Sequence, residues 1–324
     1  MINKIGVIIV YFGSTPEYFQ HFINGCKFND HIDWIFVTDI KDIPIVSDNI
    51  HRINFSLDAF NNLAGKKLGF PVAIKNPYKL CDFKPAYGLI FEEYLEKYEY
   101  WGYCDIDIIL GKTEQFLPFR KISNYDVIST YKGFLSGPFC LYRNIDSIKR
   151  LFTLNPQYKA ILQNPKYLAF DENIQRSAIS GITMVKILYF LQFILSSIFE
   201  LNFYSFSLKE FRYQFQWFVK RKTIPEQYPA DITEIAFLQH RLKEIKLYTH
   251  ELLFSDSYYK RINRKTSRIK WEKGILTDMD KNRQIFGFHF RESKNHPGFI
   301  IDYYDGSFTI TEKGIFKERE SENQ

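Results

Sequence analysis

The sequence predicts an α/β protein in which a mixed β-sheet is flanked by helices. Two observations support this fold class. Over the first half of the chain, short apolar runs that end in turn residues alternate with segments whose apolar residues recur at helical spacing. The 324 residues are 45% hydrophobic and 25% charged, which are ordinary globular proportions and enough to bury a sizeable core.

The chain opens with the pattern of a β-α-β unit. Residues 5–11 form a continuous apolar run, as expected of a buried parallel strand, and residues 32–38 form the next one. Between them, residues 16–27 place aromatic and aliphatic side chains at helical spacing. Further strands are expected at 52–55, 100–111, 125–130 and 137–142, and helices at 57–68 and 87–95.

The pattern changes after residue 150. Residues 184–199 are apolar almost all around a helix, yet they fall short of the ~20 residues of a membrane span. They predict either an interfacial helix or a buried helix beneath the aromatic residues 203–218. Residues 285–290 predict a late strand, and residues 299–304 and 308–311 a closing β-hairpin with Asp305-Gly306 at its turn. We expect an α/β core at 1–155, a helical, aromatic-rich segment at 156–230, a C-terminal part at 231–317 and a disordered tail at 318–324.

Charge and cysteine content narrow the function. The net charge of +6 suits an anionic ligand or an anionic membrane surface, but the basic residues are dispersed, so no nucleic-acid partner is expected. The four cysteines contain no C-x-x-C pair, which indicates neither a zinc knuckle nor a disulfide framework and favours a reducing compartment. The apolar N-terminal run lacks a signal-peptide cleavage site and is too short to cross a bilayer.

Two carboxylates interrupt the apolar run at 100–111. In a strand, side chains alternate between faces, so Asp105 and Asp107 would project from the same face. Burying such a pair without partners is costly, so basic residues or a divalent cation are expected beside it. Carboxylate oxygens suit Mg²⁺ or Mn²⁺, which often complete their coordination with substrate phosphates. The pair therefore predicts a metal- and phosphate-binding site, and the alternative is a solvated strand end.

Four segments resemble glycosyltransferases of the GT-A fold, and among these a group of bacterial proteins of surface-polysaccharide (lipopolysaccharide or capsule) assembly. They are YFGSTPEYF at 11–19, NPYKLCDFKPAYG at 76–88, YWGYCDID at 100–107 and SGPFCLYRN at 136–144. The resemblance implies a GT-A-like, Rossmann-like sheet whose D-x-D motif holds a metal on a nucleotide diphosphate. It also implies transfer of a hexosyl group from a nucleotide-sugar donor, most simply a UDP-sugar, to a saccharide or lipid-linked acceptor. Such an enzyme is expected in the cytoplasm, with peripheral contact at the cytoplasmic face of the inner membrane.

The resemblance also implies a donor site. Its first loop, at Tyr11, would receive the base and ribose, and basic residues from the second segment and from the C-terminal part would hold the phosphates. A helical turn would bring Asp82 beside Lys79. A simple surface ion pair, without contact to a donor, would explain the same two residues. The implied donor-binding residues are Tyr11, Phe12, Gly13, Asp39, Lys79, Asp82, Lys84, Asp105, Arg291 and Lys294.

The metal ligands implied by the resemblance are Asp105, Asp107 and His289. Imidazole suits Mn²⁺ better than Mg²⁺, so manganese is the expected cofactor and magnesium the alternative. An inverting transferase needs a carboxylate that takes the proton of the acceptor hydroxyl. The resemblance places it at Asp171 or at the adjacent Glu172, with Asp231 and Glu234 in reserve. A retaining enzyme needs no dedicated base.

Two other functions fit the same residues. A nucleotidyltransferase acting on sugar phosphates also uses an aspartate pair and a metal, although the loop after the first strand lacks the glycine-rich basic sequence expected there. A protein that has kept this fold and binds a sugar or nucleotide without turnover is the non-enzymatic alternative. Donor binding without hydrolysis would distinguish it.

Overall fold

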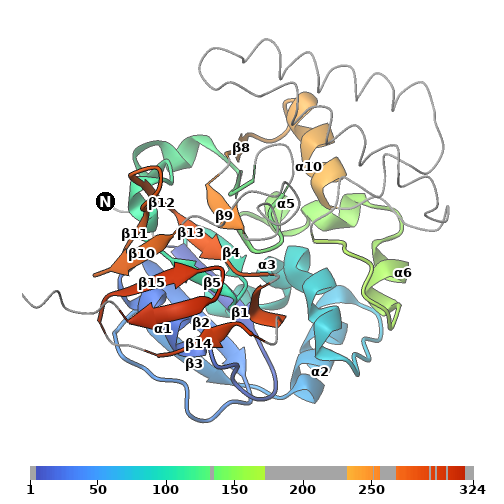
Figure 1. Cartoon of the computed structure of the whole chain (residues 1–324). Helices are drawn as coiled ribbons and strands as arrows, with labels where there is room; N and C mark the ends of the chain where they lie inside the picture. Colours follow the sequence, from blue (N-terminus) through green and yellow to red (C-terminus); the bar gives the residue numbers. More distant parts are fainter. Residues whose placement is uncertain are drawn as a thin grey trace, which may run out of the picture.

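The structure is a computed structural model that describes residues 5–131, 135–171, 232–250, 252–255, 268–291, 293–295, 298–303 and 306–317. Its centre is a seven-stranded sheet in the order β3-β2-β1-β4-β7-β6-β8, with helices on both faces (Figure 1). Parallel and antiparallel pairs occur in this one sheet, so the predicted α/β class with a mixed sheet is confirmed.

Four neighbouring strands make up the parallel half of the sheet. Strand β1 (Ile5–Val10) lies between β2 (Ile32–Thr38) and β4 (Tyr100–Cys104), and β3 (Ile50–Asn54) forms the edge. All three pairings are parallel, so the carboxyl ends of these strands meet at one side of the sheet. Helix α1 (Phe19–Lys27) connects β1 to β2, which confirms the β-α-β opening.

The other half of the sheet is antiparallel at β4. Strand β7 (Phe139–Arg143) pairs antiparallel with both β4 and β6 (Val127–Ser129). Strand β8 (Leu247–Thr249) then adds to β6 in parallel. Because β8 lies more than a hundred residues after β6, the C-terminal part of the chain extends the sheet that the first half begins.

Helix α2 (Leu57–Leu68) has the bounds that the sequence predicts, because both of its ends are capped. The Ser56 side chain accepts a hydrogen bond from the Ala59 amide, and Gly69 ends the helix at φ 75°. The predicted helix at 87–95 is instead interrupted at Phe91. Its parts and the remaining short helices are α3 (Tyr87–Ile90), α4 (Glu92–Leu95), α5 (Asp146–Lys149), α6 (Tyr158–Gln163) and α10 (Ile232–Arg241).

The C-terminal part also builds a six-stranded sheet in the order β12-β11-β10-β15-β16-β14. This sheet lies beside α1 (Figure 1). Directly after that helix, the Phe28 ring packs edge-on against Trp271, with 5.4 Å between the ring centroids. Its strands are β10 (Ile269–Glu272), β11 (Ile275–Asp278), β12 (Arg283–Ile285), β14 (Ile300–Ile301), β15 (Phe308–Thr311) and β16 (Gly314–Lys317).

The predicted closing hairpin is wrong in its pairing. Strand β15 pairs antiparallel with β16, whereas β14 pairs parallel with β16 on its other side. The reason lies at Gly314, where a Cβ atom would stand 2.2 Å from the Ile300 carbonyl oxygen and φ is 150°. Glycine alone permits this close approach, so it places β14 against β16, and Asp305-Gly306 is not the turn of a hairpin.

Apolar layers cover both faces of the central sheet. On one face, Phe22 of α1 packs against Trp34; on the other, Phe60 of α2 belongs to a cluster with Trp101. Helix α3 reaches the sheet through Gly88, where a Cβ atom would come within 2.2 Å of the Trp101 ring. These contacts fix the strands whose carboxyl ends form the site described below.

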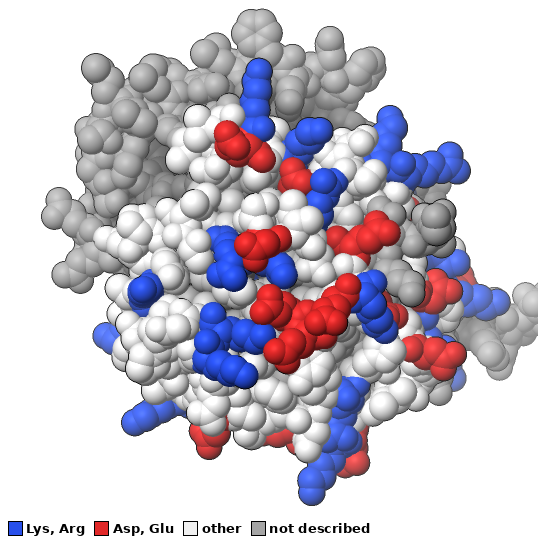
Figure 2. Space-filling view, turned by 180° about the vertical axis from the view of Figure 1, so that it is seen from behind, with Lys and Arg blue, Asp and Glu red and all other residues white. Residues whose placement is uncertain are grey.

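Three predictions fall on residues outside the described part of the chain. They are the apolar helix at 184–199, the aromatic segment at 203–218 and the tail at 318–324. Membrane contact through these segments therefore stays a prediction. On the face of the described residues that Figure 2 shows, Lys and Arg side chains lie intermixed with Asp and Glu side chains. Within the described ranges, none of the helices has the length and apolar character needed to span a bilayer.

Candidate active site

The sequence predicts one strand that contains both aspartates, but the structure places Asp105 and Asp107 in a turn between two strands. Strand β4 ends at Cys104, although the Asp105 amide still donates to the Pro138 carbonyl of the β7 side at 2.8 Å, and the chain resumes as β5 (Ile108–Leu110) in another sheet. Ile106 points into the apolar core, so the two carboxylates emerge on either side of it. The turn lies at the carboxyl end of β4, where ligands bind in open α/β sheets.

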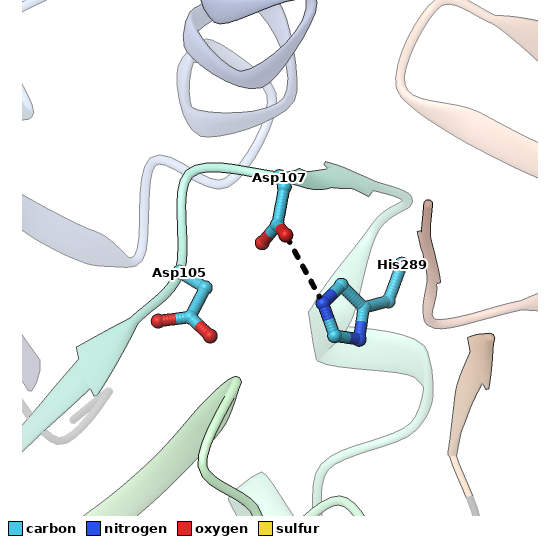
Figure 3. Close-up of side chains that lie close together, drawn as sticks. All are labelled: Asp105, Asp107 and His289. Atoms are coloured by element: carbon cyan, nitrogen blue, oxygen red, sulfur yellow. Dashed lines mark hydrogen bonds and ion pairs between the residues drawn. The ribbon is translucent and has the colours of Figure 1, made fainter. Parts of the chain in front are cut away.

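His289 reaches this turn through a three-stranded sheet in the order β5-β13-β9 (β9, Leu253–Ser255). Strand β13 (Gly287–His289) pairs antiparallel with β5, and the pairing places His289 opposite Ile108. One ligand atom from each of Asp105, Asp107 and His289 lies within 4.8 Å of the other two (Figure 3). The structure thus brings together the three predicted metal ligands.

Asp107 is buried beside a histidine and a lysine. Its Oδ2 atom lies 3.3 Å from His289 Nε2 (Figure 3). The Lys294 ammonium forms an ion pair with the same oxygen. Burial alone would raise the pKa of Asp107, but the hydrogen bond from His289 and the charge of Lys294 hold that pKa well below its usual range. Asp107 is therefore a carboxylate at neutral pH, as a metal ligand must be.

Lys84 connects the D-x-D turn to Asp171. Its Nζ atom lies 2.6 Å from Asp105 Oδ1 and 3.2 Å from Asp171 Oδ2, and it donates to the Gly137 carbonyl at 2.9 Å. Burial alone would lower the pKa of Lys84, but the charges of Asp105 and Asp171 raise that pKa well above its ordinary value. The ring of Tyr103 lies 5.6 Å from the ammonium. Lys84 is thus a fixed cation between two carboxylates.

Lys79 and Asp82 form a closed pair behind this site. Their side chains are only 2% and 0% exposed, with Nζ and Oδ2 2.7 Å apart, so the surface ion-pair interpretation is wrong. Asp82 accepts the amide hydrogens of Leu168 and Phe170, both at 2.8 Å. Between these amides, Ala169 adopts φ 57°. The pair therefore holds a left-handed bend directly before Asp171.

Lys79 ties the same loop from its other side. Its ammonium donates to the carbonyls of Ile161 and Lys166, at 2.7 and 2.9 Å. Together with Asp82, these contacts fix residues 161–170 over η1, the 3₁₀ helix Pro77–Ala86. We therefore name Lys79 and Asp82 the loop clamp, and direct contact between them and a donor stays a prediction.

The loop after β1 turns at Gly13, beside Asp39. The Gly13 amide donates to Asp39 Oδ1 at 3.0 Å, and φ at Gly13 is 106°. The Tyr11 hydroxyl donates to the Ser14 carbonyl, and Lys294 lies close enough to oppose the rise that burial causes in the Tyr11 pKa. Phe12 differs from its neighbours because its side chain is buried in the core.

Comparison with known proteins assigns the chain to a family. The profile of a family of unknown function (DUF6625) matches residues 7–318. This chain belongs to the DUF6625 family. A comparison with curated proteins finds no match.

Several solved structures have a weak likeness to this DUF6625 chain. The galactosyltransferase LgtC, in complex with donor and acceptor sugar analogues, is 11% identical with a TM-score of 0.30, and the match covers 49% of this chain and 66% of LgtC. GlyE, a glycosyltransferase of Streptococcus pneumoniae TIGR4, is 12% identical with a TM-score of 0.30, over 78% of this chain and 66% of GlyE. PaToxG glycosyltransferase is 15% identical with a TM-score of 0.29, over 68% and 85%. The chain thus spans just under two thirds of LgtC and GlyE, and likenesses this weak carry no argument about function.

Three tyrosines of the site were missed from the sequence. Tyr18 packs edge-on against Phe290 at 4.8 Å, and burial together with the charge of Asp107 raises its pKa well above the ordinary value. Tyr103 lies beside Lys84, and the Tyr167 hydroxyl donates to Asp171 Oδ1 at 3.0 Å. Tyr18 lies within the segment 11–19 that carries the resemblance, but an aromatic residue there predicts core packing equally well.

The structure describes only some of the remaining predicted site residues. Arg291 follows Phe290 directly and is exposed. Glu172 and Asp231 lie outside the described residues, and Glu234 belongs to α10 without a description of its side chain. Among the acidic candidates for the acceptor side, Asp171 is therefore the one that the described contacts link to the D-x-D turn, through Lys84.

Proposed function

We propose that this chain is a metal-dependent glycosyltransferase that moves a hexosyl group from a nucleotide-diphosphate donor, most simply a UDP-sugar, to a saccharide or lipid-linked acceptor. The observation that carries the proposal is the convergence of Asp105, Asp107 and His289 within 4.8 Å, at the carboxyl end of β4. Lys294 and Lys84 lie directly beside these carboxylates. A cation site flanked by ammonium groups suits a diphosphate, which needs both kinds of positive charge.

The three side chains fit a divalent cation. Cis ligands of an octahedral ion, each about 2.1 Å from the metal, lie about 3 Å apart. His289 Nε2 and Asp107 Oδ2 are 3.3 Å apart, and Asp105 completes the group within 4.8 Å. One imidazole and two carboxylates favour Mn²⁺ over Mg²⁺. When bound, such an ion would stabilise the negative charge that develops on the leaving nucleoside diphosphate.

The proposed donor-binding residues surround this group. Lys294 already pairs with Asp107, and Arg291 is exposed three residues before it, so both would reach phosphate oxygens. Tyr11 would stack on the base, and the bond between Gly13 and Asp39 would shape the turn that receives the ribose.

Asp171 is the proposed proton acceptor for an inverting transfer. Its Oδ2 atom faces Lys84 and its Oδ1 atom accepts from Tyr167, so the carboxylate is held in one orientation. The loop clamp fixes the bend that precedes it. Deprotonation of an acceptor hydroxyl requires a carboxylate held within hydrogen-bond reach of that hydroxyl, and Asp171 would take this role.

The cellular setting of the proposal rests on the sequence resemblance alone. We propose surface-polysaccharide assembly in a bacterial cytoplasm, with contact between residues 184–218 and the inner membrane.

The test is calorimetric titration of UDP into the purified chain, with and without Mn²⁺. We expect binding that requires the metal and is lost in Asp105→Asn/Asp107→Asn. A matched control is Asp30→Asn/Asp146→Asn, because the side chains of those aspartates are 93% and 69% exposed and distant from the site in sequence. Binding that ignores both the metal and the D-x-D variant would overturn the proposal.

A further inference from the structure

Two tyrosines stand together on the rim of the acceptor side. Tyr78 is 62% exposed. This exposure is high for an aromatic ring, since removing the ring from water would be favourable. Its ring meets Tyr167 at 4.8 Å with an interplanar angle of 70°. We name this pair the tyrosine platform.

The platform is rigidly connected to the candidate active site. Tyr167 is held by its hydroxyl, which donates to Asp171 Oδ1 at 3.0 Å, and Asp171 Oδ2 faces Lys84. Tyr78 is held through the backbone, because its amide donates to the Asn76 side chain at the start of the 3₁₀ helix Pro77–Ala86. Tyr167 is thus held directly at the carboxylate proposed to activate an acceptor, and the Tyr78 ring packs against Tyr167.

We propose that the tyrosine platform is an outer acceptor subsite, which stacks against the apolar face of a sugar ring. The proposal rests on the transferase function above and adds the class of acceptor: an oligosaccharide with at least two sugar rings. The first ring would present its hydroxyl to Asp171, and the second would cover Tyr78.

The contacts of Tyr167 set this length. Its ring lies 4.8 Å from the Tyr78 ring, and its hydroxyl donates to Asp171 at 3.0 Å, so Tyr167 stands between Tyr78 and Asp171. A single sugar ring at Asp171 would therefore lie beside Tyr167, and a second ring is needed to cover Tyr78.

The chemistry of the platform suits a sugar. A tyrosine offers a large apolar face at low cost in conformational entropy, together with a hydroxyl that remains hydrated at the rim. A pyranose ring has a face of axial C–H groups and a periphery of hydroxyls. Stacking the two would remove the exposed apolar surface of Tyr78 from water without burying a polar group.

The experiment is saturation-transfer NMR on the full chain with Mg²⁺, using lactose and cellobiose as disaccharide probes and methyl β-galactoside and methyl β-glucoside as monosaccharide probes. We expect stronger signals from at least one disaccharide, with the largest transfer to protons on one face of its outer ring. In Tyr78→Ala, disaccharide binding is expected to weaken by about fivefold to tenfold, the size of one aromatic contact. Tyr78→Phe is expected to retain it.

Tyr94→Ala is the matched control, because Tyr94 is 40% exposed on α4 and contacts Phe91. Equal disaccharide signals in Tyr78→Ala and Tyr94→Ala, or no disaccharide signal in the wild type, would overturn the platform. UDP titration separates this failure from that of the transferase function. Metal-dependent UDP binding without a Tyr78-dependent saccharide signal removes the platform alone, whereas the converse leaves a sugar-binding site on a protein that is not a transferase.

Discussion

Two lysine–aspartate arrangements lie within one short helix and its neighbours, yet they differ in what surrounds them. In the loop clamp, Lys79 and Asp82 are 2% and 0% exposed, and the described contacts of both groups go to backbone atoms or to each other. At the D-x-D turn, Asp107 and Lys84 are also buried, but the Asp105 and Lys294 side chains are 30% and 24% exposed. The first arrangement is closed and stabilises the fold, whereas the second reaches solvent through Asp105 and Lys294.

The difference teaches how a buried ion pair and a binding site can be told apart. A closed pair satisfies its desolvated charges with hydrogen bonds inside the protein, so removing one partner leaves the other stranded. An open arrangement gathers three carboxylates, those of Asp105, Asp107 and Asp171, around two lysines and one histidine. An added divalent cation would make this group suited to an anionic ligand.

The largest expected effect is on stability and comes from the loop clamp. Asp82→Ala strands the Lys79 charge and two buried amides, so the free energy of unfolding should fall by about 3–5 kcal/mol. Asp105→Asn should cost less than about 1 kcal/mol, because Lys84 keeps Asp171 and the Gly137 carbonyl as partners. Urea denaturation of both variants measures the contrast, and equal losses would abolish the distinction between the closed and the open arrangement.

The next effect concerns pH and the open arrangement. His289 and Lys294 lower the pKa of Asp107 in the folded state despite its burial. A lowered carboxyl pKa contributes stability above the unfolded-state pKa of about 4, and this contribution is lost as the pH falls toward the folded-state pKa. In EDTA, the wild type should therefore lose stability more steeply than Asp107→Asn as the pH falls from about 5 to about 2. Parallel stability curves would show that Asp107 has no such partners.

The smallest expected effect tests whether the loop clamp holds Ala169 in a strained backbone conformation. Ala169→Gly should stabilise the protein by about 0.5–1 kcal/mol, because glycine adopts the left-handed conformation without steric cost. Ala160→Gly, inside helix α6, is the matched control and should destabilise by a similar amount. The two substitutions therefore differ in sign, and a loss of stability in both would contradict the assignment of strain to Ala169.

Much of the first half of the fold was predictable because its signals are local. The apolar run of β2 and the caps at Ser56 and Gly69 fix elements by their own residues, and the predicted bounds are confirmed. The break after Cys104 was not predictable, since it depends on the pairing of β5 with β13, which lies more than 170 residues further along. The position of β14 likewise depends on its approach to Gly314.

The site divides in the same way. The aspartate pair is recognisable in the sequence as two charges in an apolar run. The proximity of His289, which lies 182 residues away from Asp107, was implied only by the resemblance to a family. The burial of the loop clamp depends on carbonyls and amides at 161–170, more than 80 residues from Lys79. Spacing places Asp82 beside Lys79, but it contains no information about what covers them.

The central claim is that Asp105, Asp107 and His289 hold a divalent cation. Electron paramagnetic resonance tests it directly, because Mn²⁺ loses its sharp free-ion signal when a protein binds it. In the presence of UDP, the wild type should bind one ion per chain. The affinity of Asp107→Asn and of His289→Gln for the ion should each be about 100-fold lower. The same affinity in the wild type, both variants and Asp30→Asn would contradict the account.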